Sequence, residues 1–507
     1  MLVQEFLENS ADSLPNKVAL VSDGQRLTYA EVEAQANRLA NAFKEQGLQR
    51  GDRVVLYLPN SIEIAIAIFA VLKAGGVFVP LNPSTKYDKC AYILNNCQAK
   101  VLIATGRQAE LAEQLAQEVS SLNTIVLTSL PAETPSFHFL SYAAIQCDYD
   151  AQRPAKVNID LDLACLIYTS GSTGDPKGVM SDHSNVVFAA SSIIEYVGNV
   201  ESDIVICLSP LSFDYGLYQL LMVFKFGGTL VLEKGFAFRA AILKRIAEER
   251  VTGFPGVPTI YAMLLKMDLT PYDLSSLRYL TNTAAALPAS HIVEIRATFP
   301  WARLFSMYGL TETKRTLYLP PEQLDKRPDS VGIAIPGTEV WIEDEQGERP
   351  VAGEVGELVV RGRHVMRGYW DDPEKTAIRF RPGSIPGERV CYTGDLFRMD
   401  NEGFMYFVSR KDDIIKSRGE KVAPKEVENV IYSLPGVREV AVIGVPDTML
   451  GEAVKAFVVV EGNGISQTDI LRHCRTHLED FMVPKFVELH SELPKTLSGK
   501  IKKTDLK

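Results

Sequence analysis

The first two-thirds of the chain alternates short apolar runs with longer amphipathic segments, and this alternation restricts the fold more than any other feature. The runs of strand length occupy residues 53–58, 77–81, 101–104 and 124–127, and the helix-like segments occupy residues 29–46 and 61–73. Strands that alternate with helices form largely parallel sheets covered by helices. We therefore predict an α/β fold.

The pattern changes past Val331 and again near Asp412. Short strand-like runs at residues 339–343 and 357–362 are joined by turns rich in Gly and Pro, which favours a small barrel-like part. The tail combines a helix that begins near Pro424 with strands at 440–445 and 456–460, a small α+β pattern. A chain of 507 residues is long enough for more than one domain. We place the domains at residues 1–411 and 412–507.

A loop rich in Gly, Ser and Thr follows the buried strand predicted at residues 163–167. Glycines allow close approach, hydroxyl groups donate hydrogen bonds and a lysine adds positive charge, a combination suited to phosphate. A helix is predicted at 183–197, so we expect a strand, a loop and then a helix. Gly178 follows the lysine, which excludes a Walker A loop, and a plain surface loop is the less favoured alternative. The predicted phosphate ligands are Thr169, Ser170, Gly171, Ser172, Thr173, Gly174 and Lys177.

Four more segments follow this loop in a fixed order. They are Tyr308–Thr313 (YGLTET), Tyr392–Asp395 (YTGD), Arg410–Glu420 (RKDDIIKSRGE) and Pro494–Lys500 (PKTLSGK). With the loop, they resemble the motifs of the adenylate-forming superfamily, which contains acyl-CoA synthetases, luciferases and amino-acid adenylation domains. The resemblance extends over essentially the whole chain. It implies a large N-terminal domain, a small mobile C-terminal domain, and an AMP-forming acid–thiol ligase that uses ATP and Mg²⁺.

The resemblance also implies roles for residues that bind the nucleotide. Thr311 would contact the α-phosphate, Glu312 would ligate Mg²⁺, and Tyr308 would stack on adenine. Asp395 would accept hydrogen bonds from both ribose hydroxyls, and Arg410 would contact the same ribose. Taken alone, Glu312 reads equally as a solvated acid at a helix start, and Asp395 as a turn residue.

Further roles concern the tail. Lys500 would bridge the substrate carboxylate and the α-phosphate as charge develops. Asp412 matches the hinge of the family, where a rotation would withdraw Lys500 after adenylation. The same rotation would bring Gly419 and Glu420 to the arm of the incoming thiol.

The acid pocket is expected around residues 209–218 and next to the YGLTET segment, with Tyr215, Tyr218 and Met307 among its residues. Many acyl-CoA synthetases have a histidine in the first of these segments, whereas this chain has Phe213-Asp214. Asp214 therefore resembles the aspartate that pairs with an amino-acid ammonium, and helix capping is an equally weighted alternative. Arg315 is unusual for the family; it either neutralises Asp214 or binds an acidic group.

Three functions remain open at this point. The first is a ligase that adenylates a small amino acid, with L-proline as the candidate, and loads it onto the phosphopantetheine thiol of a separate carrier protein, as in secondary-metabolite biosynthesis. The second is an acyl-CoA synthetase that uses a carboxylic acid and free coenzyme A. The third, a nucleotide-binding protein without catalysis, is disfavoured by Lys500 and Glu312.

Composition limits partners and location. The net charge of −10 argues against nonspecific binding to nucleic acid. The seven cysteines are dispersed and form no CxxC pair, as expected for buried thiols in a reducing compartment. No basic segment precedes an apolar run at the N-terminus, and the longest strongly apolar stretch, residues 64–72, is shorter than the ~20 residues of a membrane span. We expect a cytoplasmic protein without a membrane span.

Overall fold

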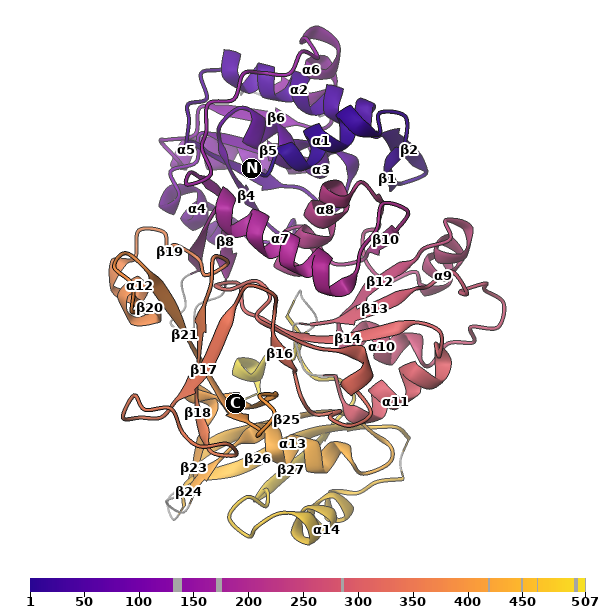
Figure 1. Ribbon diagram of the computed structural model, residues 1–507, viewed down its shortest axis with the longest axis vertical. Coiled ribbons are helices and arrows are strands. Elements are labelled where there is room, and N and C mark those ends of the chain that lie inside the picture. The colour runs from indigo at the N-terminus through magenta and orange to yellow at the C-terminus, as the bar shows by residue number, and fades with distance from the viewer. Residues whose placement is uncertain are drawn as a thin grey trace.

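The computed structural model describes residues 1–130, 139–169, 176–283, 287–417, 420–447, 450–462, 464–496 and 500–506. Four sheets organise these residues (Figure 1). Two large, mostly parallel sheets and one antiparallel sheet are built before residue 411, and the fourth sheet begins at Ile415. The α/β class predicted from the alternation is confirmed.

An eight-stranded sheet contains most of the strands predicted near the N-terminus. Its order is β19-β9-β8-β4-β3-β5-β6-β7, parallel from β8 to β7 and antiparallel where β9 pairs with β8 and β19. The predicted helix at 183–197 is present, but β9 lies between it and the glycine-rich loop. The loop thus joins two antiparallel strands rather than a strand and a helix. The strands are β3 (Arg53–Tyr57), β4 (Val77–Pro80), β5 (Val101–Ala104), β6 (Thr124–Leu127), β7 (Leu140–Ser141), β8 (Leu163–Thr169), β9 (Lys177–Asp182) and β19 (Gly368–Tyr369).

A nine-stranded sheet forms the second large layer. Its order is β16-β15-β14-β13-β12-β10-β11-β1-β2, with a parallel centre and antiparallel pairs at both edges. The strands are β1 (Val18–Ser22), β2 (Gln25–Thr28), β10 (Ile204–Cys207), β11 (Thr229–Leu232), β12 (Gly253–Gly256), β13 (Tyr279–Asn282), β14 (Arg303–Tyr308), β15 (Leu317–Leu319) and β16 (Ile333–Ala334).

One continuous apolar core joins the two large sheets through helices α2, α3, α7 and α8. Ser61 caps α3 by accepting a hydrogen bond from the Ile64 N–H, and residues 64–73 of this helix are all buried. No helix among the described residues combines the length and apolar character needed to cross a membrane. The helices before residue 300 are α1 (Glu5–Ser13), α2 (Tyr29–Glu45), α3 (Ile62–Lys73), α4 (Tyr87–Asn96), α5 (Ala109–Glu118), α6 (Tyr142–Asp148), α7 (His183–Val197), α8 (Asp214–Phe226), α9 (Arg239–Glu248), α10 (Pro258–Leu264), α11 (Ala289–Thr298) and the 3₁₀ turn η1 (Gly106–Gln108).

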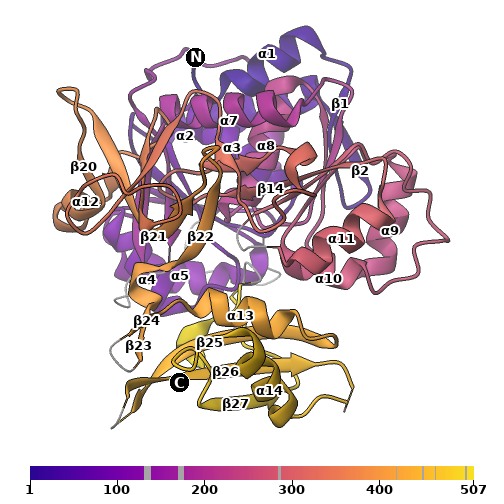
Figure 2. The same cartoon turned by 60° about the horizontal axis from the view of Figure 1, so that its bottom comes forward.

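Two smaller antiparallel-rich sheets complete the molecule. In the third sheet the order is β17-β18-β21-β20, and β22 also pairs with β21. The fourth sheet, β24-β23-β26-β25 with β27 on β26, carries α13 and α14 and lies below the rest of the molecule in Figure 2. The third sheet holds β17 (Glu339–Glu343), β18 (Val355–Arg361), β20 (Phe380–Pro382), β21 (Arg389–Met399) and β22 (Met405–Arg410), and the fourth holds β23 (Ile415–Ser417), β24 (Glu420–Val422), β25 (Val437–Asp447), β26 (Gly451–Val460) and β27 (Phe486–His490). The remaining helices are α12 (Pro373–Arg379), α13 (Pro424–Tyr432), α14 (Gln467–His477), η2 (Pro321–Gln323), η3 (Lys411–Asp413) and η4 (Lys503–Asp505).

Candidate active site

The glycine-rich loop connects two neighbouring antiparallel strands. Thr169 and Lys177 are register partners at the ends of β8 and β9, so both ends of the loop lie at the same edge of this strand pair. The predicted ligands Ser170, Gly171, Ser172, Thr173 and Gly174 lie outside the described residues. The Lys177 ammonium is 5.5 Å from the centre of the Tyr369 ring.

Two further cations accompany Lys177. Burial lowers the pKa of Lys177, and the positive charges of Lys375 and Arg379 act in the same direction, which places both near it. Both belong to α12, about 200 residues later in the chain. Such a concentration of positive charge beside a glycine-rich turn suits the phosphates of a nucleotide. The sequence analysis did not identify Lys375 and Arg379, because no motif around α12 marks them as phosphate ligands.

Glu312 lies in the turn after β14. The Tyr369 hydroxyl donates to Glu312 Oε1 at 2.6 Å, and the Met366 N–H donates to the Glu312 backbone oxygen at 3.0 Å. Burial alone would lower the pKa of the Arg379 guanidinium, but the nearby Glu312 and Tyr369 outweigh burial, so the pKa is raised overall. Glu312 therefore faces the same cationic region as the loop, and Thr311 beside it is half-buried.

A divalent cation fits Glu312 only with help from the nucleotide. Within the described ranges, no three His, Cys, Asp or Glu side chains gather into a ready-made metal site. Mg²⁺ commonly takes one or two carboxylates together with phosphate oxygens and waters. A single carboxylate next to a phosphate-binding region matches that requirement.

Gly309 makes the YGLTET turn possible. A Cβ atom at this position would collide with the backbone oxygen of Lys314 and the Cα of Arg315. The turn folds back so that Thr316 N–H donates to the Tyr308 oxygen at 2.9 Å. The turn thereby packs the residues after Glu312 against those before it.

Tyr308, Asp395 and Arg410 meet where the end of β14 adjoins the third sheet, as predicted for one nucleotide site. The Tyr308 hydroxyl donates to Asp395 Oδ2 at 2.6 Å, and Arg410 Nε lies 3.8 Å from Asp395 Oδ1. Asp395 and Arg410 are register partners on β21 and β22. Burial raises the pKa of Asp395, and the hydrogen bond from Tyr308 and the positive charge of Arg410 oppose that rise. The Tyr308 hydroxyl, the Asp395 carboxylate and the Arg410 guanidinium therefore belong to one network.

Lys500 reaches this network from the tail. Backbone contacts hold it: the Thr496 N–H donates to the Lys500 oxygen at 2.7 Å, and Lys495 and Ile501 form an isolated antiparallel β-bridge. Burial and the charge of Arg410 lower the pKa of Lys500, whereas Asp395, Glu312 and Asp214 act in the opposite direction. These influences place the Lys500 ammonium within electrostatic reach of the carboxylates on which the predicted chemistry depends.

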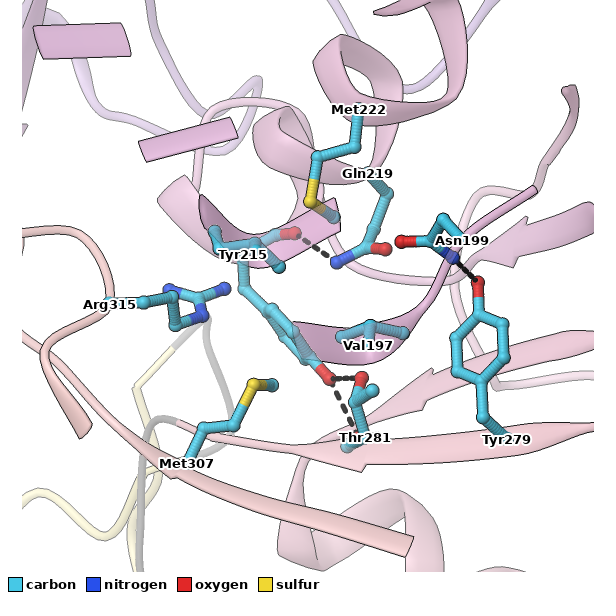
Figure 3. A pocket seen from close by; sticks show the side chains of 10 residues that line it. Val197, Asn199, Tyr215, Gln219, Met222, Tyr279, Thr281, Met307 and Arg315 are labelled. Carbon is cyan, nitrogen blue, oxygen red and sulfur yellow. Dashed lines mark hydrogen bonds between the residues drawn. The ribbon is translucent and has the colours of Figure 1, made fainter. Parts of the chain in front are cut away.

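A pocket adjoins this site on the inner side of β14. The cavity is narrow, with a volume of about 10 Å³, which is about the space of one water molecule. The ring of Tyr215 stands in it, with the hydroxyl 2.7 Å from the Thr281 backbone oxygen and Arg315 beside the ring (Figure 3). The lining residues are Ile193, Val197, Asn199, Tyr215, Gln219, Met222, Tyr279, Thr281, Met307 and Arg315.

The pocket and the nucleotide network share one strand. Met307 lines the pocket, and the next residue, Tyr308, bonds Asp395. Successive side chains of a strand point to opposite faces. Two more of the residues predicted for the acid, Tyr215 and Arg315, also line the pocket. Tyr218 is buried outside the lining, with the centre of its ring 5.9 Å from the Lys314 ammonium.

Asp214 is paired within the protein. Lys314 Nζ lies 2.9 Å from Asp214 Oδ1, and both side chains are buried. Asp214 is the first residue of α8, whose N-cap is Phe213, and no side chain caps the helix, so the capping alternative is wrong. Neutralisation of Asp214 by Arg315, one of the two alternatives for that arginine, is also wrong, because the neighbouring Lys314 pairs with Asp214 instead.

The hinge and thiol residues lie apart from this cluster. Asp412 is exposed in η3, the turn between β22 and β23, and the adjacent Lys411 pairs with Glu357 at 3.0 Å. Glu420 is exposed at the start of β24, and Gly419 lies outside the described residues. Neither Asp412 nor Glu420 forms a hydrogen bond or ion pair with Lys500, Glu312 or Asp395.

Several known proteins are similar to this chain. The family profile described as AMP-binding enzyme matches residues 7–370, and the AMP-binding enzyme C-terminal domain matches residues 426–500. A long-chain-fatty-acid–CoA ligase of Bacillus subtilis (strain 168) is 34% identical over 531 residues, which cover 98% of this chain and 93% of the relative. A feruloyl-CoA synthase of an Amycolatopsis species is 35% identical over 499 residues, covering 97% and 96%. The solved structure of the anthranilate CoA ligase AuaEII in complex with anthranoyl-AMP matches with a TM-score of 0.91 at 29% identity, covering 100% and 96%.

Proposed function

Because this chain belongs to the family of AMP-binding enzymes, we propose that it activates a small carboxylic acid with ATP and transfers the acyl group to the thiol of coenzyme A. The chain is an adenylate-forming acid–thiol ligase. The acceptor, the acid and the residue roles are the proposed part.

The observation that carries the proposal is that residues of separate motifs gather: Tyr308 and Arg410 meet Asp395, and Lys500 lies within range of the charges of Asp395 and Glu312. In the first step an oxygen of the acid attacks the α-phosphorus of ATP, an acyl-adenylate forms and pyrophosphate leaves. Negative charge builds on the α-phosphoryl oxygens, and Lys500 would stabilise it. Lys177, with Arg379, would hold the departing phosphates, and Asp395 would orient the ribose.

Mg²⁺, when bound with ATP, supplies positive charge to the phosphate oxygens. Glu312 would hold it, and Tyr369 fixes the orientation of that carboxylate through its hydroxyl. In the second step the thiolate of coenzyme A attacks the acyl carbon, AMP leaves and a thioester forms.

Two observations favour coenzyme A over a carrier protein and a carboxylic acid over an amino acid. The similar proteins described above are CoA ligases or a CoA synthase. In addition, the charge of Asp214 is already balanced by Lys314, so this carboxylate is not free to pair with a substrate ammonium. The comparisons thus favour the second of the three functions considered above over the loading of proline.

Pyrophosphate exchange over a panel of fatty, aryl, dicarboxylic and amino acids tests the first step. Thioester formation is then compared with coenzyme A and with a holo-carrier protein at equal thiol concentration. We expect exchange with non-amino acids and transfer to coenzyme A. Exchange restricted to amino acids, or ADP in place of AMP as product, would refute the proposal.

A further inference from the structure

The pocket beside the nucleotide site contains a buried positive charge without a carboxylate partner among the described residues. Arg315 is 4% exposed. Its Nη1 donates to the Lys314 backbone oxygen at 3.2 Å, and its guanidinium carbon lies 4.8 Å from the centre of the Tyr215 ring. A guanidinium has five N–H donors, so these contacts leave most of its capacity unused. Burial of a charge is costly unless the charge is paired.

No nearby acid removes this excess charge. Asp214 is adjacent to Tyr215, but Lys314 already neutralises it at 2.9 Å. The three charged groups, one acid and two bases, therefore sum to a single positive charge. Stacking on Tyr215 compensates only part of the lost hydration, because a cation–π contact is weaker than a hydrogen-bonded ion pair.

The remaining polar walls of the pocket are neutral. Gln219 Nε2 donates to the Tyr215 backbone oxygen at 3.1 Å, Asn199 Nδ2 donates to the Tyr279 hydroxyl at 2.8 Å, and Thr281 meets the Tyr215 hydroxyl. Figure 3 shows Arg315 directed toward the Tyr215 ring, with Gln219 and Met307 nearby. A narrow pocket with one buried positive end favours a short ligand that carries a negative charge at its far end over a long apolar chain.

We infer that the acid that this enzyme activates is a short dicarboxylic acid whose second carboxylate pairs with Arg315. The inference rests on the proposed function, since it names the substrate of the same site. A carboxylate accepts two parallel N–H bonds from a guanidinium, which fixes both charge and direction. Only the first carboxylate attacks the α-phosphorus with loss of pyrophosphate; the second stays ionised and unchanged.

The test compares each dicarboxylic acid of four to eight carbons with its monomethyl ester. The ester keeps the chain and loses one charge. Wild-type pyrophosphate exchange should favour the diacid, and Arg315→Leu should lower kcat/KM for the diacid by about 30-fold or more, as expected for removing one partner of a buried charge pair. The same variant should change kcat/KM for the ester by less than about threefold. The Arg315→Lys variant should recover part of the diacid activity.

Two controls separate charge recognition from damage to the fold. Arg303→Leu removes an exposed arginine at the start of the same strand β14 and should leave the diacid preference intact. The melting temperature of each variant is measured with and without diacid and ATP. A diacid should raise the melting temperature of the wild type and not that of Arg315→Leu, whether or not turnover occurs.

The outcomes distinguish the two proposals. If the rate of pyrophosphate exchange with monocarboxylic acids equals the rate with diacids, the dicarboxylate inference is overturned, whereas the proposed acid–CoA ligase function is not. An equal loss for diacid and ester in Arg315→Leu also overturns it, because Arg315 would then hold the reacting carboxylate. The absence of pyrophosphate exchange with every acid counts against the proposed function, and the melting-temperature shifts then test the dicarboxylate inference alone. A diacid-induced shift in the wild type that Arg315→Leu abolishes supports the inference. The absence of a shift in the wild type refutes it.

Discussion

Removal of the Lys314 ammonium should destabilise the protein strongly. The ion pair with Asp214 is 2.9 Å long, and the side chains are 0% and 6% exposed. Without Lys314 the Asp214 carboxylate stays buried without an opposite charge, and its Oδ2 already lacks a hydrogen-bond partner among the described residues. Breaking one side of a buried ion pair costs about 3–5 kcal/mol.

This cost converts into a measurable melting shift. An unfolding entropy of about 2.1 cal/mol/K per residue gives about 0.8 kcal/mol/K for a domain of roughly 400 residues, so the expected loss in melting temperature is about 4–6 °C. Calorimetry of Lys314→Met and Asp214→Leu should each show it. The double variant should return to within about 2 °C of the wild type, because replacing a whole buried pair by apolar groups is often nearly neutral.

A surface pair provides the matched control. Lys234 lies 2.8 Å from Asp23, with both side chains about 60% exposed, and Lys234→Met should shift the melting temperature by less than about 1 °C. If the two buried variants behaved like this control, or if their effects simply added in the double variant, the buried pair would not be the interaction described here.

Four further predictions concern catalysis. Lys500→Ala should abolish most acyl-adenylate formation and spare thioester formation from a supplied adenylate; equal loss of both steps would contradict the role of Lys500. Because burial lowers the pKa of Lys500, the rate of wild-type adenylation should fall with rising pH before the ordinary lysine pKa is reached. The Lys500→Arg variant should lose less of its rate over the same alkaline range. Identical alkaline pH profiles of the two enzymes would count against a role for the Lys500 ammonium. Asp412→Pro should slow transfer to the thiol more than adenylation in single-turnover assays, and an unimpaired second step would remove the hinge. Arg379→Ala should raise the KM for ATP by about tenfold or more, and an unchanged value would exclude Arg379 from the phosphate site.

Much of the fold follows from local pattern. The apolar runs that became β3 to β6 and the capped segment that became α3 carry their period and their end signals within a few residues. Strand β9 was missed because residues 177–182 contain glycine and polar residues, and only pairing with β8 makes them a strand. The predicted order of loop and helix failed for that reason.

The site divides in the same way. Tyr308, Asp395 and Arg410 belong to recognisable motifs, and the structure brings them together. The pairing of Asp214 was not predictable, because two adjacent cations, Lys314 and Arg315, follow the motif and only the fold shows that Lys314 reaches it. Arg379 was equally hidden, since its place beside Glu312 depends on how α12 packs, not on its neighbours in sequence.

The shared strand β14 determines where this enzyme tolerates redesign. Met307 lines the acid pocket and directly precedes Tyr308, which bonds Asp395. A substitution at Met307 that is meant to change acid specificity is therefore also expected to disturb ATP binding. Helix α8 offers a safer handle: Tyr215, Gln219 and Met222 stand one turn apart on one face and belong to the pocket alone. Libraries aimed at that face should broaden the range of acids accepted while the nucleotide half of the reaction is inherited unaltered.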